Sequence, residues 1–471
     1  MEKYEFKGKI LIVGFGSIGQ GVLPLILRHF TIPSERVTIV TGDSRGENVA
    51  RELGVRFIIH PLLPGNYEEV VRSYIGAGDF LVNVSVDVSS AALIEHCQRN
   101  NILYIDTVME PWLGFYVDSS LSVSQRSNYA LREMSLNLRN LSIEGPRPTA
   151  VLAHGANPGL VSHFVKQALL NIAKDTGIQT EMPTTREAWA RLAKDLGVKV
   201  IHIAERDTQE SPAPKSIGEF VNTWSIDGFA AEGSQPAEMG WGTHEKKLPE
   251  DAREHDFGPK SAIYLERPGY ATRVRSWTPT SKAQYGWIIT HHESISISDY
   301  LTLKEGNKVV YRPTVHYAYH PCDGAVLSLD ELAASNGVQQ KVQRLISEDI
   351  LSDGVDELGV LLMGHAKGAY WYGSRLSIDA ARKLVPHNNA TALQVTASMI
   401  GAMVWAMENP IAGIVDADEI DHETVVNVAR PYLGEVFGEY TDWTPIQGRG
   451  KLFPEHFDAV DPWQFENFRV S

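Results

Sequence analysis

Residues 10–19 read Ile-Leu-Ile-Val-Gly-Phe-Gly-Ser-Ile-Gly, a short apolar run that breaks into glycines at its end. Because residues 20–28 continue in a helical pattern, this stretch predicts a strand, a glycine turn and a helix in succession. Gly14 permits the tight turn, Gly16 lets backbone N–H groups approach a pyrophosphate, and Gly19 lets the helix pack on the strand. The helix N-terminus adds partial positive charge for the phosphates. The stretch therefore predicts a dinucleotide-binding site of the Rossmann type, with expected contacts at Gly14, Gly16, Ser17, Ile18 and Gly19.

The chain continues with an alternation of strand and helix patterns. Strands are expected at residues 36–41, 55–59, 79–87 and 102–107, and helices at 66–75 and 89–100. Such alternation implies a parallel sheet that binds ligands at the carboxyl ends of its strands. The residues expected to contact the cofactor at these ends are Asp43, Asn83, Asp106 and Thr107.

The end of the second strand bears on the choice between NAD and NADP. Thr41 occupies the position where an acidic residue usually holds the adenosine ribose. Asp43, two residues later, can reach the ribose hydroxyls, whereas Arg45 can instead meet a 2′-phosphate. We favour NAD as the cofactor and keep NADP as the alternative.

The composition indicates a protein of two or three domains. The chain has 471 residues, no stretch approaches the uncharged apolar length of a membrane span, and the N-terminus lacks a signal-peptide pattern. We therefore expect a soluble cytoplasmic protein with no membrane partner. The formal net charge of −15 disfavours nucleic acid as a partner and suits either solubility or a cationic ligand. Cys97 and Cys322 support neither a disulfide framework nor a zinc site, and we expect no metal.

Composition shifts along the chain mark candidate domain boundaries. Gly-Pro-Arg-Pro at residues 145–148 ends the first domain, so we expect a dinucleotide-binding domain at 1–148, a second domain at 149–385 and a C-terminal segment at 386–471. Strand patterns rich in Trp, Tyr and Thr indicate that the second domain is α+β with a mixed sheet. The predicted fold class is thus α/β, with a doubly wound parallel sheet followed by an α+β domain. A helix at residues 389–407, with small residues along it, is expected to return the chain to the first domain.

Two helix starts in the second domain carry capping signals. Asn157 and Pro158 precede a predicted helix at residues 160–174 in the order typical of an N-cap and first turn. Thr184 and Glu187 match a capping box for the next helix.

A stretch without lysine or arginine runs from residue 216 to residue 245. Its tryptophans and carboxylates are Trp224, Trp241, Glu219, Asp227, Glu232, Glu238 and Glu245. Carboxylates attract an ammonium group, and a desolvated indole face adds a cation–π interaction of about 2 kcal/mol. The stretch therefore suits a bound cation, and a solvated acidic surface with a core tryptophan is an equally weighted alternative.

Three further polar positions are candidates for chemistry, each with a structural alternative. Asn157 lies in a glycine-flanked loop, where helix capping is its simplest role. Glu205 closes an expected strand and has an ion pair with Arg206 as its alternative role. The run His291-His292-Glu293-Ser294 is expected to end an apolar strand, with one histidine pointing inward.

Beyond these features, the sequence resembles the bacterial homospermidine synthases over essentially its whole length. The matching segments are Gly-Phe-Gly-Ser-Ile-Gly at 14–19, Tyr-Ile-Asp-Thr at 104–107, Glu-Pro-Trp-Leu-Gly-Phe-Tyr at 110–116, Gly-Ala-Asn-Pro-Gly at 155–159, Ile-His-Ile-Ala-Glu-Arg-Asp-Thr-Gln at 201–209, Phe-Val-Asn-Thr-Trp-Ser at 220–225, Glu-Ser-Ile-Ser-Ile at 293–297, Tyr-Trp-Tyr-Gly-Ser at 370–374 and Tyr-Thr-Asp-Trp-Thr-Pro at 440–445. The sequence departs from the family pattern at His292, where Asn is expected. Together these matches are far more specific than the glycine turn alone.

The resemblance implies an activity and a set of site residues. Two putrescine molecules would become homospermidine and ammonia, with NAD retained as a recycled prosthetic group and spermidine as a further candidate substrate. Residues 149–385 would bind the substrate and form a homodimer. The catalytic residues would be Trp224, which holds cationic intermediates, together with Asn157, Glu205 and His291. The substrate-binding residues would be Glu232, Asp87, Glu110 and Asp356.

In the expected mechanism, a base such as His291 or Glu205 first takes a proton from a bound ammonium group. Hydride then passes to NAD, a second amine attacks the resulting iminium, ammonia leaves, and the same hydride returns. A net dehydrogenase for a saccharopine-like or carboxynorspermidine-like substrate is the alternative. It would need a cationic fork for the carboxylate, which Arg206 or Arg273 could supply. A non-enzymatic NAD-binding sensor is the alternative of another class.

Overall fold

The computed structural model describes residues 3–347, 349–386 and 388–470. The chain folds into two compact units, each built from segments that are far apart in the sequence. Unit 1 contains the residues up to 160 together with 223–228 and 379–433. Unit 2 contains residues 161–222, 229–378 and the chain from 434 onward.

Unit 1 is built around a seven-stranded parallel sheet in the order β22-β8-β7-β6-β2-β4-β5. Its strands are β2 (Ile10–Val13), β4 (Val37–Thr41), β5 (Arg56–Ile59), β6 (Phe80–Asn83), β7 (Leu103–Asp106), β8 (Ala150–Leu152) and β22 (Ile414–Asp416). β1 (Tyr4–Glu5) and β3 (Phe30–Thr31) form a separate parallel pair. Every residue of β2 is buried, as is typical of a parallel sheet covered on both faces. The doubly wound α/β fold predicted from the sequence is confirmed.

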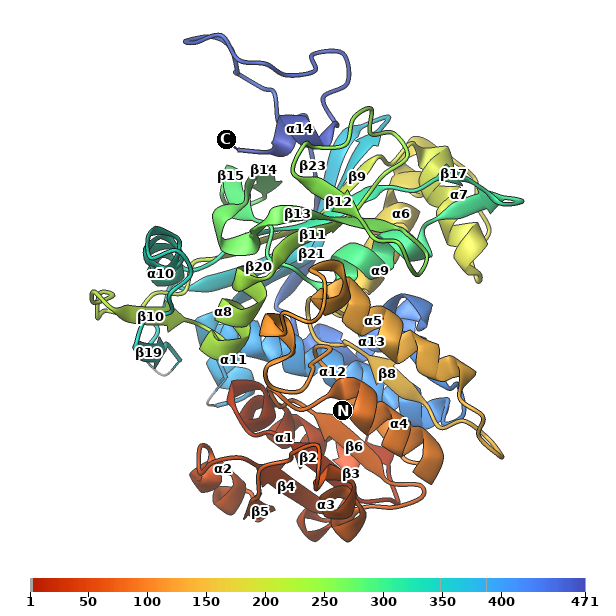
Figure 1. The fold of residues 1–471 in the computed structure, drawn as a ribbon, viewed down its shortest axis with the longest axis vertical. Helices are drawn as coiled ribbons and strands as arrows, with labels where there is room; N and C mark the ends of the chain where they lie inside the picture. Colours follow the sequence, from red (N-terminus) through yellow and green to blue (C-terminus); the bar gives the residue numbers. More distant parts are fainter. Residues whose placement is uncertain (1–2, 348, 387, 471) are drawn as a thin grey trace. The chain divides into compact units, whose positions relative to one another are not determined.

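Helices pack on both faces of this sheet, and Figure 1 shows them around β2, β4 and β6. The helices of unit 1 are α1 (Ser17–His29), α2 (Glu47–Glu52), α3 (Tyr67–Tyr74), α4 (Ser90–Asn100), α5 (Asn128–Asn137), α11 (Ile378–Leu384), α12 (Ala390–Glu408) and α13 (His422–Ala429), of which α13 packs on α12. Leu93 and Cys97 of α4 share a buried cluster with Leu11 and Leu81 of the sheet. α12 packs against α1, and the Asn389 side chain caps its first turn. The helix expected at residues 389–407 therefore lies beside the glycine-turn helix.

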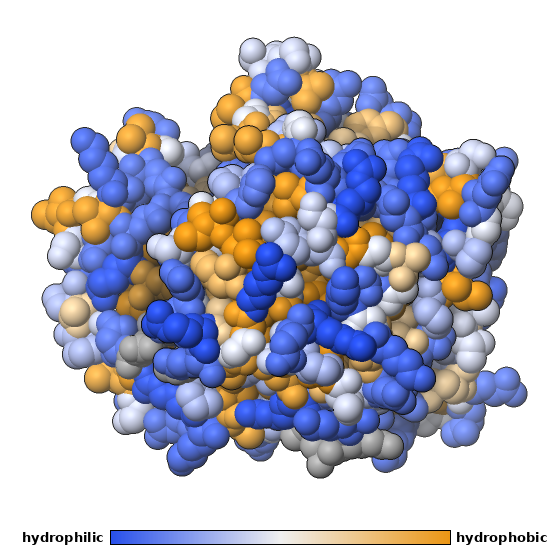
Figure 2. Space-filling view, turned by 90° about the horizontal axis from the view of Figure 1, so that it is seen from below, coloured by the Kyte–Doolittle hydropathy of each residue, from blue (hydrophilic) through white to orange (hydrophobic). Residues whose placement is uncertain are grey.

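The prediction that no stretch approaches the length of a membrane span was wrong for helix α12. By length and composition its 19 residues are apolar enough to cross a membrane, but 83% of the apolar window is buried inside the protein. A Cβ at Gly401 would lie 2.8 Å from the carbonyl oxygen of Val425 on α13, so the small residues serve close helix packing. The face drawn in Figure 2 mixes hydrophilic and apolar residues.

Unit 2 is built around a ten-stranded mixed sheet. Its main path is β12-β13-β11-β18-β9-β20-β21-β23, and β14 and β15 join it through β18. The strands are β9 (Val200–Asp207), β11 (Pro236–Gly240), β12 (Ala252–Glu254), β13 (Ala262–Pro268), β14 (Arg273–Thr278), β15 (Lys282–Trp287), β18 (Thr314–His320), β20 (Val355–His365), β21 (Gly368–Ser377) and β23 (Glu435–Thr441). β9 and β18 are parallel, whereas β11 pairs antiparallel with β18 and β20 pairs antiparallel with β9. The mixed sheet predicted for this part of the chain is confirmed.

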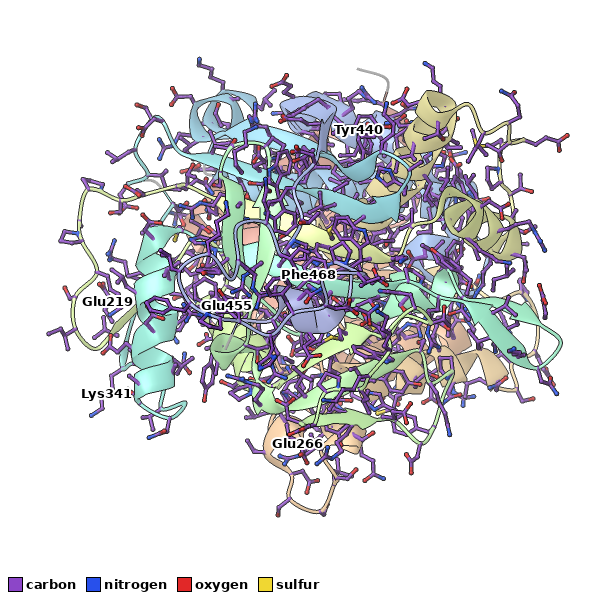
Figure 3. The ribbon with its side chains drawn as sticks, turned by 90° about the horizontal axis from the view of Figure 1, so that it is seen from above. Glu219, Glu266, Lys341, Tyr440, Glu455 and Phe468 are labelled. Atoms are coloured by element: carbon purple, nitrogen blue, oxygen red, sulfur yellow. The ribbon has the colours of Figure 1, made fainter. Side chains whose placement is uncertain are left out.

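Smaller elements complete unit 2. β10 (Glu219–Asn222) pairs in parallel with β19 (Val342–Leu345), and β16 (Leu303–Glu305) pairs antiparallel with β17 (Lys308–Tyr311). The helices are α6 (Leu160–Thr176), α7 (Arg186–Leu196), α9 (His292–Tyr300), α10 (Asp323–Ala334) and α14 (Phe465–Phe468), and α8 (Ile226–Ser234) begins in the segment assigned to unit 1. Phe468 of α14, labelled in Figure 3, joins Trp277 and Trp371 in the core of unit 2. The C-terminal residues are therefore part of this core.

Several element boundaries differ from the sequence predictions. The strand expected at residues 79–87 ends at Asn83, and Asp87 adopts φ +62° in the turn that follows. α7 is capped by Thr185, whose hydroxyl accepts from the backbone N–H of Ala188, and not by Thr184. The capping-box pattern therefore identified the helix and misplaced its cap by one residue.

Two further predictions about local structure were wrong. The strand expected to reach the His291-His292 pair ends at Trp287, and His292 starts helix α9. Both histidines are buried, whereas only one was expected to point inward. Asn157 lies in the turn before Gly159, and α6 starts at Leu160, so Asn157 does not hold the N-cap position. A Cβ at Gly159 would lie 2.3 Å from the carbonyl oxygen of Gly155, which shows how tightly this turn closes.

Candidate functional site

The glycine turn of unit 1 has the geometry that a pyrophosphate requires. Gly14 has φ +84°, and a Cβ there would lie 2.6 Å from the Cα atom of Ser85. A Cβ at Gly19 would lie 2.9 Å from the carbonyl oxygen of Gly14, so glycine lets α1 pack this closely on the turn. A Cβ at Gly16 would meet nothing within 4 Å, which leaves space in front of the first N–H groups of α1. The turn therefore fits a dinucleotide.

The residues beyond β4 lie where the adenosine ribose is expected. The Asp43 carboxylate accepts from the Arg45 side chain at 2.8 Å, and this hydrogen bond lowers the pKa of Asp43. Both side chains are exposed, so Asp43 remains accessible to ribose hydroxyls. Because the charge of Arg45 is already compensated by Asp43, this pairing favours NAD over NADP.

Asn83 and Asp106 end strands β6 and β7 and are joined through Tyr104. The Tyr104 hydroxyl donates to Asp106 Oδ2 at 2.7 Å, and Asn83 Nδ2 donates to the Tyr104 oxygen at 3.2 Å. The other Asp106 oxygen accepts from the backbone N–H of Ala153 at 2.6 Å. Asp106 is fully buried, so its geometry suits support of the sheet edge, whereas Thr107 beside it is half-buried. Direct contact of these residues with the cofactor stays a prediction.

Two predicted substrate residues of unit 1 lie close together at this sheet edge. The backbone N–H of Asp87 donates to Glu110 Oε2 at 3.4 Å. Burial and the carboxylate of Asp227 raise the pKa of Asp87. Glu110 also lines a cavity of about 460 Å³, together with Trp112 and Phe115. Asp87, Glu110 and Asp227 therefore form an acidic group on unit 1.

Trp224 belongs to the short segment 223–228, which clusters with unit 1. Asn389 Nδ2 donates to the first carbonyl of this segment at 2.5 Å. The Ser225 hydroxyl accepts from the backbone N–H of Gly228 at 3.1 Å at the start of α8. These bonds fix the segment on unit 1 and leave the Trp224 side chain half-buried.

The stretch without lysine or arginine serves several structural purposes. Glu219 forms an ion pair with Arg344 at 2.8 Å. Glu245 accepts from a threonine of β18 at 2.6 Å and from a backbone N–H of the C-terminal segment at 3.0 Å. Trp241 packs against the core of unit 2. Trp241 is thus the core tryptophan of the structural alternative, but Glu219 and the Glu245 side chain are buried and paired and do not form a solvated acidic surface. Glu232 is the carboxylate of the stretch that contacts His291.

His291 lies between two carboxylates of unit 2. Its Nε2 atom is 3.1 Å from Glu232 Oε2, and its Nδ1 atom is 3.2 Å from Glu293 Oε1. Burial lowers the pKa of His291, but the carboxylates of Glu293 and Glu232 outweigh burial and raise this pKa to about 10. At neutral pH both ring nitrogens therefore carry a proton and donate to the carboxylates. His291 can give a proton but is not free to take one.

Glu205 lies on β9 and contacts Tyr317 of β18. Glu205 Oε2 accepts a hydrogen bond from the Tyr317 hydroxyl, and Glu205 is buried. Arg206, the alternative partner, follows Glu205 directly, so it points to the opposite face of the strand and donates to Asp323 at 3.2 Å. The centroid of the Tyr317 ring lies 4.4 Å from that of His291. Tyr317 therefore links Glu205 to His291, which in turn contacts Glu232 and Glu293.

Two predicted site residues lie outside these direct contacts. Asp356 on β20 is fully buried and in register with Asp207 of β9. Burial is the main cause that raises the pKa of Tyr319, and the carboxylates of Glu205, Asp207 and Asp356 add to this effect. Asn157 is half-buried in a turn of unit 1. Their roles toward a substrate stay predictions.

One cluster in unit 2 consists of Glu205, Glu232, His291, Glu293, Tyr317 and Tyr319. The sequence analysis did not identify the last three of these as site residues. Glu293 follows His291 by two positions, and the start of α9 between them turns its carboxylate back to the imidazole. Tyr317 and Tyr319 alternate along β18, and their rings are stacked with centroids 5.2 Å apart. The period of two on an apolar strand beside Glu205 was the available signal.

Comparisons with known proteins agree with this architecture. Residues 10–146 match the saccharopine dehydrogenase NADP binding domain, and residues 155–441 match the saccharopine dehydrogenase C-terminal domain. The chain is 54% identical over 471 residues to homospermidine synthase from Blastochloris viridis, covering 99% of this chain and 98% of that protein. It is 51% identical over 472 residues to homospermidine synthase from Mesorhizobium japonicum, covering 99% and 97%.

A solved structure is similar over the same extent. The crystal structure of homospermidine synthase from Legionella pneumophila in complex with NAD has a TM-score of 0.93 and 50% identity, covering 100% of this chain and 99% of that chain. The identity and coverage of these relatives show the family at the level of the whole chain. The protein therefore belongs to the homospermidine synthase family, whose two domains are of the saccharopine dehydrogenase type.

Proposed function

We propose that this protein condenses two putrescine molecules into homospermidine and ammonia. The observation that carries the proposal is the pair of carboxylates Glu232 and Glu293 on His291, with the buried Glu205 joined to them through Tyr317, because such a density of carboxylates suits a substrate with two ammonium groups. The names of the relatives from Blastochloris viridis and Mesorhizobium japonicum support the same activity. The reaction balances, since two diamines give one triamine and one ammonia.

We assign NAD as the cofactor. The glycine turn and the N-terminus of α1 would hold the pyrophosphate, and Asp43 would bind the ribose. The similar Legionella structure contains NAD, which supports this assignment. When bound, NAD accepts a hydride from the carbon next to an amine nitrogen and later returns it. The other residues proposed to contact it are Ser17, Ile18, Asn83, Asp106 and Thr107.

Proton transfers at the substrate nitrogen fall to Glu205 and His291. The first substrate ammonium must lose a proton, because the nitrogen has to supply an electron pair before its neighbouring carbon is oxidised. His291 is already protonated at neutral pH, so the Glu205 carboxylate takes this proton. The second amine adds to the oxidised carbon through an unprotonated nitrogen. The proton on His291 Nε2 then passes to the departing nitrogen, which leaves as ammonia, and His291 regains a proton from the newly bonded nitrogen. Glu205 returns its proton to the product amine.

Carboxylates anchor the ammonium groups that do not react. Glu232 is the less buried of the two carboxylates on His291, which suits an ammonium that enters from solvent. Glu293 is fully buried, and its Oε2 atom has no hydrogen-bond partner within the described part of the chain. An ammonium group at this oxygen would satisfy it.

The remaining predicted residues receive supporting roles. Trp224 would stabilise a cationic intermediate through its indole face. Asp87 and Glu110 would attract the diamine to unit 1, and Asn157 would donate to or accept from a substrate nitrogen. Asp356 would support the cluster from β20.

A turnover assay tests the proposal. The purified protein is incubated with putrescine and a catalytic amount of NAD, and the polyamines and ammonia formed are identified while absorbance reports reduced cofactor. Homospermidine and ammonia in equal amounts, without accumulation of reduced cofactor, are expected. Binding of NAD without any conversion of putrescine would contradict the proposal and favour a sensor.

The structure also bears on the alternative of a net dehydrogenase for a carboxylated substrate. Arg206 donates to Asp323 at 3.2 Å and to a backbone carbonyl at 3.0 Å, and Arg273 stacks over Tyr285. The hydrogen bonds of Arg206 within unit 2 disfavour it as a fork for a substrate carboxylate, whereas the exposed Arg273 has only the ring contact among the residues that the structure describes. Stoichiometric formation of reduced cofactor in the same assay would favour this alternative.

We further propose that the protein acts in the cytoplasm and forms a homodimer. Cys97 and Cys322 are buried free thiols, which suits a reducing compartment. Light scattering of the purified protein would test the dimer, and a mass equal to the single chain of 52.2 kDa would contradict it.

A further inference from the structure

Tyr317 occupies a central place in the sheet of unit 2. β18 carries it between β9 and β11, and Tyr317 is in register with Ile203 of β9. Neighbouring residues of a strand point to opposite faces, so Tyr317 and Tyr319 lie on the same face as Glu205. Tyr317 is 2% exposed. A buried tyrosine at this point either fills the core or organises the groups around it.

The contacts of Tyr317 connect the two chemical parts of the cluster. Its hydroxyl donates to Glu205 Oε2. Its ring lies 4.4 Å from the His291 ring, centroid to centroid, at an interplanar angle of 42°. The Tyr317 ring also stacks on that of Tyr319, with centroids 5.2 Å apart and an interplanar angle of 6°. One side chain thus touches both residues to which the proposed function gives a proton transfer.

We propose that Tyr317 is a positioning residue that holds the Glu205 carboxylate ionised with its hydroxyl and the His291 imidazolium in place with its ring. The proposal rests on the proposed function for the roles of Glu205 and His291. A hydrogen bond donated to a carboxylate favours the charged form, which is the form that accepts a proton from the substrate. An aromatic face in contact with an imidazolium favours the protonated form of the imidazole.

The surroundings of Tyr317 keep its hydroxyl a donor. Burial, followed by the carboxylates of Glu205 and Glu293, raises the pKa of Tyr317 well above its ordinary value. The phenol therefore stays neutral throughout the working pH range. The charged and titratable groups that face it are Glu205, Glu293, His291 and Tyr319.

The variants Tyr317→Phe and Tyr317→Leu separate the two contacts. Tyr317→Phe removes the hydrogen bond to Glu205 and keeps the ring against His291, whereas Tyr317→Leu removes both. Tyr311→Phe is the matched control, because Tyr311 is also a buried tyrosine of unit 2 and donates to the backbone carbonyl of Val198 at 2.9 Å. It loses one buried hydrogen bond without touching the cluster.

Two readouts test the role of the hydroxyl. In the pH profile of kcat/KM for putrescine, Tyr317→Phe should move the acidic limb up by about one pH unit and lower the plateau about 10- to 100-fold. The carboxyl ¹³C signal of Glu205, assigned by its loss in Glu205→Gln, should titrate at higher pH in Tyr317→Phe than in the unsubstituted protein. Tyr311→Phe should leave both readouts unchanged.

The outcomes separate this proposal from the proposed function. If the protein makes no homospermidine, the proposed function fails, and the Glu205 titration still decides the role of Tyr317. An unchanged Glu205 titration in Tyr317→Phe, or an equal change in Tyr311→Phe, would overturn the positioning role. A lower His291 pKa in Tyr317→Leu than in Tyr317→Phe, read from the imidazole signals, supports the role of the ring. Equal values would overturn it, and if Tyr317→Leu does not fold, Tyr317→Met, which also lacks the ring, takes its place in the same comparison.

Discussion

Replacing Glu293 with glutamine should change how the stability of this protein depends on pH. The charge of Glu293 is the largest single cause that raises the pKa of His291, and its Oε1 atom lies 3.2 Å from His291 Nδ1. Glutamine has nearly the same shape, so Glu293→Gln removes the charge and retains the packing. The expected result is a His291 pKa well below about 10.

The structure gives the sign and size of this effect. The His291 pKa is raised from 6.5 to about 10 on folding, so the stabilisation from its proton is fully present below about pH 6.5 and is lost as the pH rises through about 10. Between these limits the free energy of unfolding falls by about 1.4 kcal/mol per pH unit through His291 alone. A carboxylate within about 4–6 Å shifts a neighbouring pKa by about 1–3 units, so Glu293→Gln should close this window about 1–3 pH units earlier.

The assay is urea unfolding at intervals between pH 6 and pH 10, combined with an NMR titration of the His291 ring. The matched control is Glu266→Gln, since Glu266 is an exposed carboxylate of unit 2, labelled in Figure 3, that pairs with Arg253. The control should keep the pH dependence of the unsubstituted protein. A His291 pKa that stays near 10 in Glu293→Gln would refute the reasoning, because it would mean that Glu293 does not hold the imidazolium.

Other substitutions test other parts of the account. Gly16→Ala should fold normally and weaken NAD binding about tenfold, about 1.4 kcal/mol, because its Cβ enters the space in front of α1; unchanged affinity in a fluorescence titration would contradict the pyrophosphate site. Gly14→Ala should lower the free energy of unfolding by about 1–3 kcal/mol, because φ is +84° and the Cβ meets Ser85, and a melting temperature equal to that of Gly16→Ala would count against this. Trp224→Ala should lower kcat about 30-fold, from a cation–π interaction of about 2 kcal/mol, while NAD binding is retained; near-normal turnover would remove Trp224 from the mechanism.

Local signals predicted most of the fold. The apolar run at residues 10–13 and the glycines after it specify strand, turn and helix through short-range sterics, and the structure has all three. Strand ends were less predictable, because the valines after Asn83 favour extended structure while the backbone already turns at Asp87. The start of α9 at His292 was missed for a similar reason, since β-branched residues precede it.

The site was predicted in part, because its members come from distant segments. Residue types and resemblance indicated Glu205, Glu232 and His291, and the structure places all three in unit 2, with Glu232 on His291 and with Tyr317 between His291 and Glu205. The protonated state of His291 could not be predicted, because it depends on two carboxylates that only tertiary packing brings to its nitrogens. Composition alone also could not separate Glu232 from Glu219, which has the same charge and is neutralised by an arginine far along the chain.

The most direct test of the central claim is the fate of deuterium in the reaction. The protein is incubated in ordinary water with catalytic NAD and putrescine deuterated on both carbons next to nitrogen, and the product is examined by mass spectrometry. We predict homospermidine that retains every deuterium, because the hydride removed from the first diamine returns to the same site. Homospermidine with one deuterium replaced by protium, or accumulation of deuterated reduced cofactor, would contradict the account.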